Sequence, residues 1–400
     1  MELVNKEVYK KIKSADIEAI ILGGGYGKGE GGVYRIKDKE YLFNDYDFFI
    51  IVKNISKKKK KKYQKILIDI SEKLTSGIGI DVDFGPLKSI KEIKNMSFTQ
   101  MWGELKFGHK VISGKNNIMD FYPYNNLNNI PETEVLKMLL NRGVGLLLAE
   151  ERLKKSNLNR EDIDFISRNI YKSGLCMGDS ILIMENTFHH LYRKRLELLN
   201  QIKNQKMIKK YNIRNIYKES LEFKLQPDHT LTKDKLIKLH KFYKETFMDI
   251  YFNLFNRFFN KFHKKNISET CEEILKINLS SNILKNILLN IRDFRLNCIS
   301  IRYFIKYPRV RLFYVLPYLL YPDLTQSEPK TYCRNSAYLN VKSCQKKHEY
   351  GIEDPNLTQS ESNRHCRYNF KNINKILGLN ISASKKNIKD RFLFLWERYN

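Results

Sequence analysis

The feature that most constrains this chain is a glycine-rich loop, GGGYGKGEGG at residues 23–32, which directly follows the apolar run DIEAIIL at 16–22. Glycines after a strand let the backbone approach a ligand closely and turn its N–H groups toward phosphate oxygens. A second apolar run, NDYDFFIIV at 44–52, comes next and carries two carboxylates. Together the two segments predict a site for a phosphate-bearing ligand beside a small sheet.

The carboxylates of this second run are two residues apart, so Asp45 and Asp47 project from one face of a strand. The same alternation recurs in GIDVDF at 79–84, where Asp81 and Asp83 alternate with apolar residues. If the two strands are neighbours, three or four carboxylates converge, and close carboxylates ionise together only beside a positive charge. The pattern therefore predicts a site for Mg²⁺, with Mn²⁺ as a possible substitute.

Other interpretations of the loop are weaker. The spacing of Gly27, Gly29 and Gly32 satisfies G-x-G-x-x-G, but no clear helix follows, so a dinucleotide fold is not indicated. A Walker-type loop is excluded because Lys28 is followed by glycine where Ser or Thr is required. A single D-x-D strand usually carries solvent-facing aspartates. The loop upstream and the second acidic strand downstream favour a site instead.

The hydrophobic pattern as a whole predicts an α+β protein, with a small mixed sheet and flanking helices in residues 1–125. Expected strands are 16–22, 47–52, 79–84 and 109–113, and expected helices are 63–74 and 98–107. Residues 126–321 are predicted to form a mostly α-helical domain that supplies the acceptor site. Its expected helices are 132–153, 160–204, 233–262, 268–305 and 309–320.

The segment 322–370 is polar and contains an internal repeat, because PDLTQSE at 322–328 recurs as PNLTQSE at 355–361. Two copies with a period of 33 residues are too few for a solenoid, so we expect a loosely structured insertion. Its cysteines and histidines lack the paired spacing of a zinc site. Residues 371–400 are expected to form a C-terminal helical segment, with a helix near 386–398.

The chain is strongly basic, since 72 Lys and Arg against 44 Asp and Glu leave a net charge of +28. Such a balance favours phosphate-bearing partners, so nucleic acid remains possible as a partner but is not favoured. No run of apolar residues is long enough to predict a membrane span. The N-terminus has no apolar leader, and with six cysteines in 400 residues this indicates a cytoplasmic protein.

The order of apolar strand, glycine loop, D-x-D strand and later acidic strand resembles the DNA-polymerase-β-like nucleotidyltransferase superfamily, particularly its minimal and antibiotic-modifying branches. Those members show G-S-[FY]-A-R-G-[ED]-A followed by S-D-[IVW]-D-[LF]. Here Gly24 and Gly25 match the Gly-Ser pair, Tyr26 the aromatic residue and Lys28 the basic residue. Glu30 matches the acid, and 44–48 matches the carboxylate strand. The resemblance covers residues 15 to 114.

The resemblance implies a nucleotidyltransferase domain over residues 1–125, with Asp45, Asp47 and Asp83 as catalytic and metal-binding residues. It also implies that Gly24, Gly25, Tyr26 and Lys28 bind a nucleoside triphosphate. A nucleoside monophosphate would then pass to a hydroxyl of a small-molecule, sugar or protein acceptor, with release of pyrophosphate.

Three features depart from the family pattern. Gly25 replaces the usual serine, the link from the loop to the D-x-D strand is longer, and Asp81 competes with Asp83 for the third carboxylate. We favour Asp83, which is nearer the end of its strand. The glycine substitution leaves open an alternative, a non-catalytic nucleotide- or partner-binding protein.

Residues after the α/β module offer weaker candidates. Arg142 could reach a phosphate, although a salt bridge is the commoner role of an arginine in mid-helix. Asp179 could orient an acceptor hydroxyl, although we favour a helix-surface carboxylate. Trp102, Tyr122 and Tyr124 could stack on a base, but aromatic residues in this register are more often core.

Overall fold

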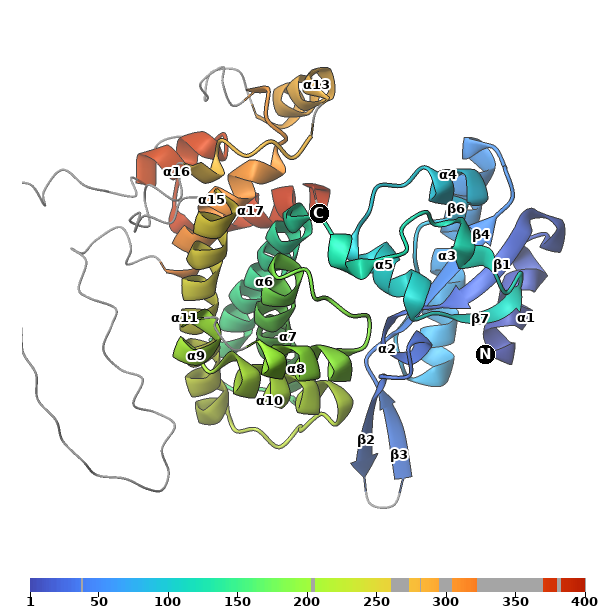
Figure 1. Cartoon of the computed structure of the whole chain (residues 1–400), viewed down its shortest axis with the longest axis horizontal. Helices are drawn as coiled ribbons and strands as arrows, with labels where there is room; N and C mark the ends of the chain where they lie inside the picture. Colours follow the sequence, from blue (N-terminus) through green and yellow to red (C-terminus); the bar gives the residue numbers. More distant parts are fainter. Residues whose placement is uncertain are drawn as a thin grey trace, which may run out of the picture. The chain divides into compact units, whose positions relative to one another are not determined.

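The computed structural model describes residues 1–36, 39–202, 206–259, 273–280, 282–294, 304–321, 370–379 and 383–399. It is an α+β structure, as the sequence predicted: a small mixed sheet near the N-terminus is followed by helices (Figure 1). The chain divides into two compact units, Met1–Asn260 and Lys261–Asn400. The α/β module and the helices up to α11 belong to the first unit.

The main sheet contains five strands in the order β5-β4-β1-β7, with β6 (Lys88–Ser89) also pairing with β4. Its central strands β1 (Ile17–Leu22) and β4 (Tyr46–Val52) are antiparallel, and β7 (Lys110–Gly114) is antiparallel to β1. By contrast, β4 is parallel to β5 (Val82–Phe84). A parallel pair needs a crossover, and α3 (Lys57–Ile78) supplies it.

Helices cover both faces of this sheet. Phe48, Ile50 and Val52 of β4 point to one face and share a core with α1 (Glu2–Lys11) and α3. On the other face, the ring of Phe49 lies 5.7 Å from that of Trp102 in α5 (Gln100–Phe107). The strands are therefore buried on both sides, which explains their near-continuous apolar sequence. Polar residues at the start of β4 are left for a site.

The segment between the glycine loop and β4 forms a hairpin that projects from the sheet (Figure 1). Its strands are β2 (Gly32–Ile36) and β3 (Lys39–Phe43). The ring of Phe43 packs edge-on against Phe223, with the centroids 6.0 Å apart, and against His229 at 5.6 Å. The long link between the glycine loop and β4 is thus a structured arm that contacts the helical part of the same unit.

The helical part of the first unit packs around α7 (Arg160–Met184), which contacts α6 (Glu132–Leu153), α10 (Ile213–Leu225) and α11 (Lys233–Phe258). Two shorter helices complete it, α8 (Tyr192–Gln201) and α9 (Lys206–Lys210). Most of α7 after Ile170 is buried, so this helix is the centre of the bundle.

In the second unit, the described helices are α13 (Ile283–Asp293), α15 (Arg309–Leu320), α16 (Phe370–Ile376) and α17 (Lys385–Tyr399). The buried Arg311 of α15 donates to the Asn290 side chain of α13 at 2.7 Å and to the Ile376 carbonyl of α16 at 3.0 Å. Buried guanidinium groups require such partners.

Within the described residues, no helix is both long and apolar enough to cross a membrane. That statement includes α15, whose twelve residues are interrupted by Pro317.

Most predicted elements are present, with differences at their ends. The predicted helix 132–153 coincides with α6, and the strand and helix bounds of the module agree to within a few residues, except that α3 starts six residues early. The predicted helix 160–204 is two helices, separated by a turn in which Asn186 has a left-handed φ of 53°. Helices α1 and α10 were not predicted.

The expected insertion 322–370, with its repeat and its cysteines and histidines, lies outside the described residues except for its last residue, where α16 begins. The expected helix 268–305 is described only in part, as α13 and its neighbouring residues. The domain boundaries inferred from the sequence stay predictions.

Candidate active site

The two acidic strands are neighbours in the sheet, as the sequence argument required. In the parallel pair of β4 and β5, Asp47 lies directly opposite Asp83. Register partners on adjacent parallel strands point to the same face, and adjacent strands are about 4.8 Å apart. Asp45 lies two residues before Asp47, on the same face. The structure therefore brings Asp45, Asp47 and Asp83 together, whereas Asp81 precedes the paired residues of β5.

These carboxylates repel one another, and the pKa of Asp47 shows it. Burial is the largest cause, and together with the charges of Asp45 and Asp83 it raises this pKa to about 6. The pKa of Asp83 is also raised, by burial and then by Asp45 and Asp81. A cluster of this kind lacks positive charge. The arrangement favours binding of a cation beside Asp47.

The glycine turn lies against the same carboxylate. It forms a single turn of helix, α2 (Gly24–Gly27), and the Gly23 N–H donates to the Asp47 carbonyl at 2.7 Å. Gly24 has a left-handed φ of +59°, and a Cβ there would overlap a carboxylate oxygen of Asp47. Only glycine fits at this position. The assignment of Gly24 to nucleotide binding stays a prediction.

Gly25 is in a different situation. A Cβ at this residue would be 3.0 Å from the Glu30 carbonyl oxygen, a tight contact rather than an overlap. Its own carbonyl accepts a hydrogen bond from the Glu30 N–H at 2.7 Å. Gly25 therefore lies in a compact loop that leaves little room for a side chain. Any contact between Gly25 and a phosphate would come from its backbone.

Tyr26 holds the hairpin in place. Its hydroxyl accepts from the Phe43 N–H at 2.9 Å and lies 2.8 Å from the Gly32 carbonyl. Burial raises the pKa of Tyr26 to about 12. The ring of Tyr26 packs on that of Tyr46, with centroids 4.7 Å apart. These contacts give Tyr26 a structural role at the base of the hairpin, in addition to its place in the predicted site.

Lys28 belongs to a buried ion network and pairs with none of the three aspartates of the acidic strands. Its ammonium pairs with Glu104 of α5, which also pairs with Arg195 of α8 at 2.8 Å. Arg195 is fully buried and reaches Asp179 of α7 at 2.8 Å, and the Tyr217 hydroxyl donates to Asp179 at the same distance. The favoured interpretation of Asp179 as a helix-surface carboxylate is wrong, because Asp179 is buried in this network.

The charges of this network support one another. Burial alone would raise the pKa of Glu104, but Arg195 and Lys28 outweigh it and lower the pKa to about 2. Glu30, next to the glycine turn, adds a second link between this turn and α8. Its carboxylate accepts from the N–H groups of Tyr192 and Arg193 at 2.6 and 3.0 Å, at the positive end of α8. The network and this cap hold the glycine turn against the helical part.

A cavity of about 110 Å³ lies among the helices of the first unit. Asn44, the residue before Asp45, is at its edge and has a left-handed φ of 77°, which asparagine tolerates better than most residues. The cavity carries four basic side chains, namely Arg142 of α6, Arg168 and Lys172 of α7, and Lys224 of α10. Basic groups thus gather at the end of the carboxylate strand.

These cations act on the carboxylates. Lys172 and Lys224 lower the pKa of Asp47 against the larger effect of burial, and Asp45 raises that of Lys172. Burial, followed by the charge of Arg142, lowers the pKa of Lys172 to about 8. Arg142 was expected to form a salt bridge. Instead it lines the cavity, and no ion pair involves it among the described residues.

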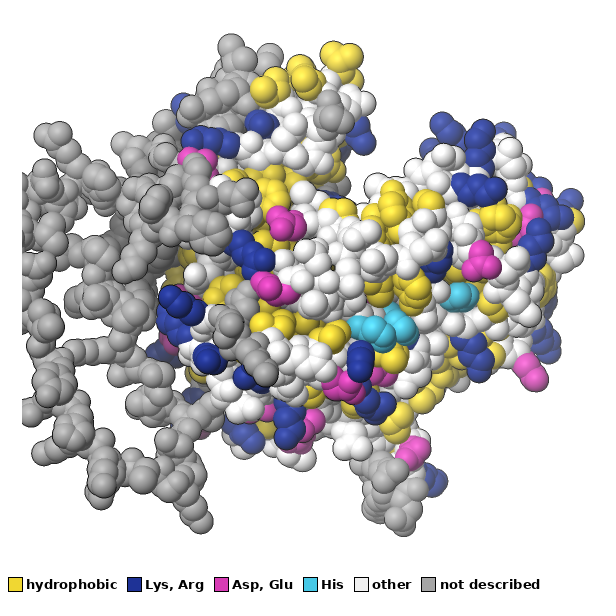
Figure 2. Space-filling view, in the orientation of Figure 1, with side chains coloured by type: hydrophobic (Ala, Val, Ile, Leu, Met, Phe, Trp, Pro, Cys, Tyr) yellow, Lys and Arg dark blue, Asp and Glu magenta, His cyan; other side chains and the backbone are white. Residues whose placement is uncertain are grey.

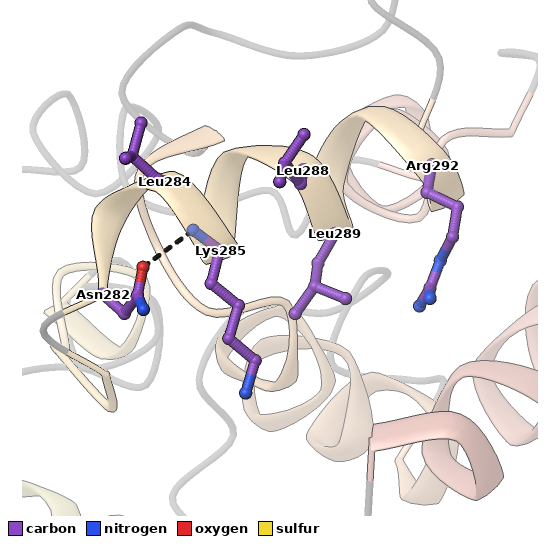
Figure 3. A pocket seen from close by; sticks show the side chains of 6 residues that line it. All are labelled: Asn282, Leu284, Lys285, Leu288, Leu289 and Arg292. Atoms are coloured by element: carbon purple, nitrogen blue, oxygen red, sulfur yellow. Dashed lines mark hydrogen bonds between the residues drawn. The ribbon is translucent and has the colours of Figure 1, made fainter.

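Two of the three aromatic candidates, Trp102 and Tyr122, are core residues, as the more common explanation held, whereas Tyr124 is half-buried. Trp102 and Tyr122 are buried, and Tyr124 stacks on Phe98 at 4.5 Å. A second cavity, of about 500 Å³, is in the second unit along α13 (Figure 3). In that view Leu284 and Leu288 point to one side of the helix and Lys285 to the other. No carboxylate lines it, so it has no counterpart of the acidic face.

Within the described part of the chain, no group of three or more His, Cys, Asp or Glu side chains is arranged to hold a metal ion by itself. Mg²⁺ in phosphoryl-transfer sites typically uses one or two carboxylates together with substrate phosphates and water. Asp45 and Asp47 supply that number, and burial, together with the charges of Asp45 and Asp83, raises the pKa of Asp47. The donor set therefore fits Mg²⁺ bound together with a triphosphate.

Sequence reasoning missed the basic side chains of the cavity other than Arg142. A signal was present, because Arg168, Lys172 and Asp179 follow one another at spacings of four and seven residues on one face of a largely apolar helix. Charges on the buried face of a helix are uncommon unless they are paired or functional. Lys224 had no such signal, since α10 was not predicted.

On the face of the molecule drawn in Figure 2, Lys and Arg side chains are scattered among other residues. Comparison with protein-family models, with curated proteins and with solved structures found no match to this chain.

Proposed function

We propose that this protein is a Mg²⁺-dependent nucleotidyltransferase, which moves a nucleoside monophosphate from a nucleoside triphosphate to an acceptor hydroxyl and releases pyrophosphate. The observation that carries the proposal is the parallel pairing of β4 and β5, which sets Asp47 beside Asp83 and next to the turn at Gly24. The resemblance of the loop and of the carboxylate strand to the nucleotidyltransferase superfamily gives the chemistry.

In this proposal each group has a distinct role. Asp45 and Asp47 would hold Mg²⁺, and the bound ion would supply neutralisation of the charge on the triphosphate. Asp83 is at the exposed edge of the acidic face, where it can take the proton from the acceptor hydroxyl as that oxygen attacks the α-phosphorus. The backbone at Gly24 and Gly25 approaches the phosphates closely. Catalysis then rests on positioning and on charge neutralisation.

The ion network around Arg195 has a positioning role in this scheme. It joins α5, α7 and α8 to the glycine turn through Lys28, and it does not reach the carboxylate face directly. We assign the helical part to acceptor binding, because the cavity beside Asn44 is formed mainly by its helices. We also propose a cytoplasmic setting, in keeping with the cysteine usage of the chain.

The proposal is tested with each nucleoside triphosphate labelled at the α-phosphate, in Mg²⁺ or Mn²⁺, with a cell extract as the source of acceptors. We expect transfer of label by the wild type and a loss of at least about a hundredfold in Asp47→Asn. Asp69→Asn is the matched control, because Asp69 is an exposed aspartate of α3. Its activity should equal that of the wild type.

Two results would contradict the proposal. Transfer of label by Asp47→Asn at the wild-type rate would show that the acidic face is not the active site. Metal-dependent nucleotide binding without turnover, over extracts from several sources, would instead favour a non-catalytic nucleotide-binding protein.

A further inference from the structure

We infer that the cavity lined by Arg142, Arg168, Lys172 and Lys224 binds a phosphate group. The inference adds a ligand site to the proposed function, but phosphate binding there does not require nucleotidyl transfer. It rests on the cavity's charge, on an unpartnered lysine and on the cavity's size.

The first argument is an excess of positive charge. Among the cavity's lining residues the acidic member is Asp179, which is already bonded to Arg195 and to Tyr217. Of the four cations, Arg168 pairs with Asp164 at 2.8 Å. The charges of Arg142, Lys172 and Lys224 are therefore left without a carboxylate in direct contact. Like charges held together at a partly buried site are costly unless an anion joins them.

The second argument concerns Lys172. Its side chain enters the cavity from the centre of α7, and within the described residues it has no hydrogen bond or ion pair. Lys172 is half-buried, and a lysine withdrawn from water usually has a partner. Burial and the charge of Arg142 lower its pKa to about 8, so the protein holds its charge at a cost. A bound anion removes that cost.

The third argument is size. The cavity measures about 110 Å³, whereas pockets for whole small molecules measure about 300–1,000 Å³. A nucleoside does not fit, but a compact anion does. Arginine and lysine together are the common ligands of phosphate, the former through paired N–H groups and the latter as a point charge. A phosphate group matches the cavity in charge, in size and in the type of donor.

Two substrates of the proposed reaction could supply the phosphate: the tail of the nucleoside triphosphate, or an acceptor that carries a phosphate of its own. Their shared chemistry is a phosphate group bound close to Asp45, whose charge acts on Lys172. The test therefore has two arms. The first asks whether the cavity binds phosphate, and the second asks which substrate supplies the phosphate.

The first arm is calorimetric titration of the full chain with inorganic phosphate and with pyrophosphate, in buffer with a chelator so that no metal takes part. We expect both to bind to the wild type. Lys172→Met should weaken binding by roughly tenfold or more, since a charge-assisted hydrogen bond is lost. A matched pair lies on α10. Lys224→Met should weaken binding, whereas Lys218→Met, at an exposed lysine of the same helix, should not.

The second arm repeats the titration with a non-hydrolysable nucleoside triphosphate and Mg²⁺ present. Displacement of phosphate by the nucleotide identifies the triphosphate tail as the source. Binding of phosphate beside the nucleotide identifies a phosphorylated acceptor. Either result supports the site.

The inference is overturned if the wild type binds neither anion more tightly than about 10 mM, or if Lys172→Met binds them as tightly as the wild type. Its failure can be told from failure of the proposed function. Asp47→Asn should lose transfer of label, but it should bind phosphate at least as well as the wild type, because a nearby negative charge has been removed. Circular dichroism of each variant checks that it is folded.

Discussion

Two clusters of buried charge lie in the first unit, and they differ in whether their charges are paired. In the ion network, Arg195 is between Glu104 and Asp179, 2.8 Å from each. At the candidate site, Asp47 and Lys172 interact electrostatically, but neither has an ion pair among the residues that the structure describes. The two clusters are joined through α7, which carries both Asp179 and Lys172.

The pKa shifts show what the difference means. In the network, Arg195 and Lys28 overcome the effect of burial and lower the pKa of Glu104 to about 2, so folding favours its charged form. At the site, burial raises the pKa of Asp47 to about 6 and lowers that of Lys172 to about 8, so folding opposes both charges. Charges held against the preference of the fold are typical of functional sites. We interpret the network as support and the site as a place for ligands.

The largest expected effect comes from breaking the network. Arg195→Met leaves Glu104 and Asp179 buried without their common partner, and removal of one member of a buried ion pair typically costs about 3–5 kcal/mol. The free energy of unfolding, measured by urea denaturation, should fall by about that amount. Arg193→Met, at an exposed arginine of the same helix, is the control and should change it by less than about 0.5 kcal/mol. Equal effects of the two variants would contradict the comparison.

At the candidate site, removal of a charge is expected to raise the free energy of unfolding rather than to lower it. The pKa of Lys172 falls from 10.5 to about 8 on folding, so the unfolded chain binds more protons between these pH values. Stability contributed by this group therefore rises with pH across that window, and at pH 7 the full cost is present. Lys172→Met should raise the free energy of unfolding by up to about 3 kcal/mol at pH 7. The gain should vanish near pH 10.5. A variant less stable than the wild type at pH 7 would show that Lys172 supports the fold.

Asp47 offers the matching test on the acidic face. Its pKa rises from 3.8 to about 6 on folding, so the folded protein binds more protons in this window and loses stability as the pH rises through it. In metal-free buffer, Asp47→Asn should be more stable than the wild type by about 2–3 kcal/mol above pH 6 and equal to it below pH 4. Addition of Mg²⁺ with a nucleoside triphosphate should raise the melting temperature of the wild type more than that of the variant. A difference in stability between Asp47→Asn and the wild type that did not change with pH would contradict this explanation.

The sequence predicted the acidic face well, because its signals are local. Alternation in a strand sets the face of each carboxylate, and the glycine turn directly precedes the hairpin and β4. The sequence favours Asp83 over Asp81 only because Asp83 is nearer the end of its strand. In the structure, the pairing of Asp83 with Asp47 also favours Asp83. Whether these residues perform the predicted chemistry stays a prediction.

The basic cavity and the ion network depend on distant residues, and so the sequence could not show them. Lys28 and Glu104 are 76 residues apart, and Arg195 comes from a third segment. In sequence, Lys28 fitted a phosphate ligand of the loop, whereas its partner is fixed by the packing of α5. The sequence shows only that the link from the loop to β4 is long, because the contacts that place the hairpin are with the distant residues Phe223 and His229.

The smallest expected effect concerns the residue that departs from the family pattern. At Gly24, a side chain would meet a left-handed φ and the carboxylate of Asp47, so Gly24→Ser should reduce stability by about 2 kcal/mol and displace the carboxylate. At Gly25 the backbone φ is ordinary and the closest contact is 3.0 Å, to the Glu30 carbonyl. Gly25→Ser, which introduces the serine of the family that the sequence resembles, should cost less than about 1 kcal/mol. If the proposed function is right, it should also tighten binding of a nucleoside triphosphate, because it adds a hydroxyl donor to the glycine turn. Thermal denaturation and nucleotide titration of the two variants measure both effects. If Gly25→Ser abolished nucleotide binding while remaining folded, the bare backbone at this position would itself be required. The glycine would then be an adaptation of this chain rather than the loss of a serine contact.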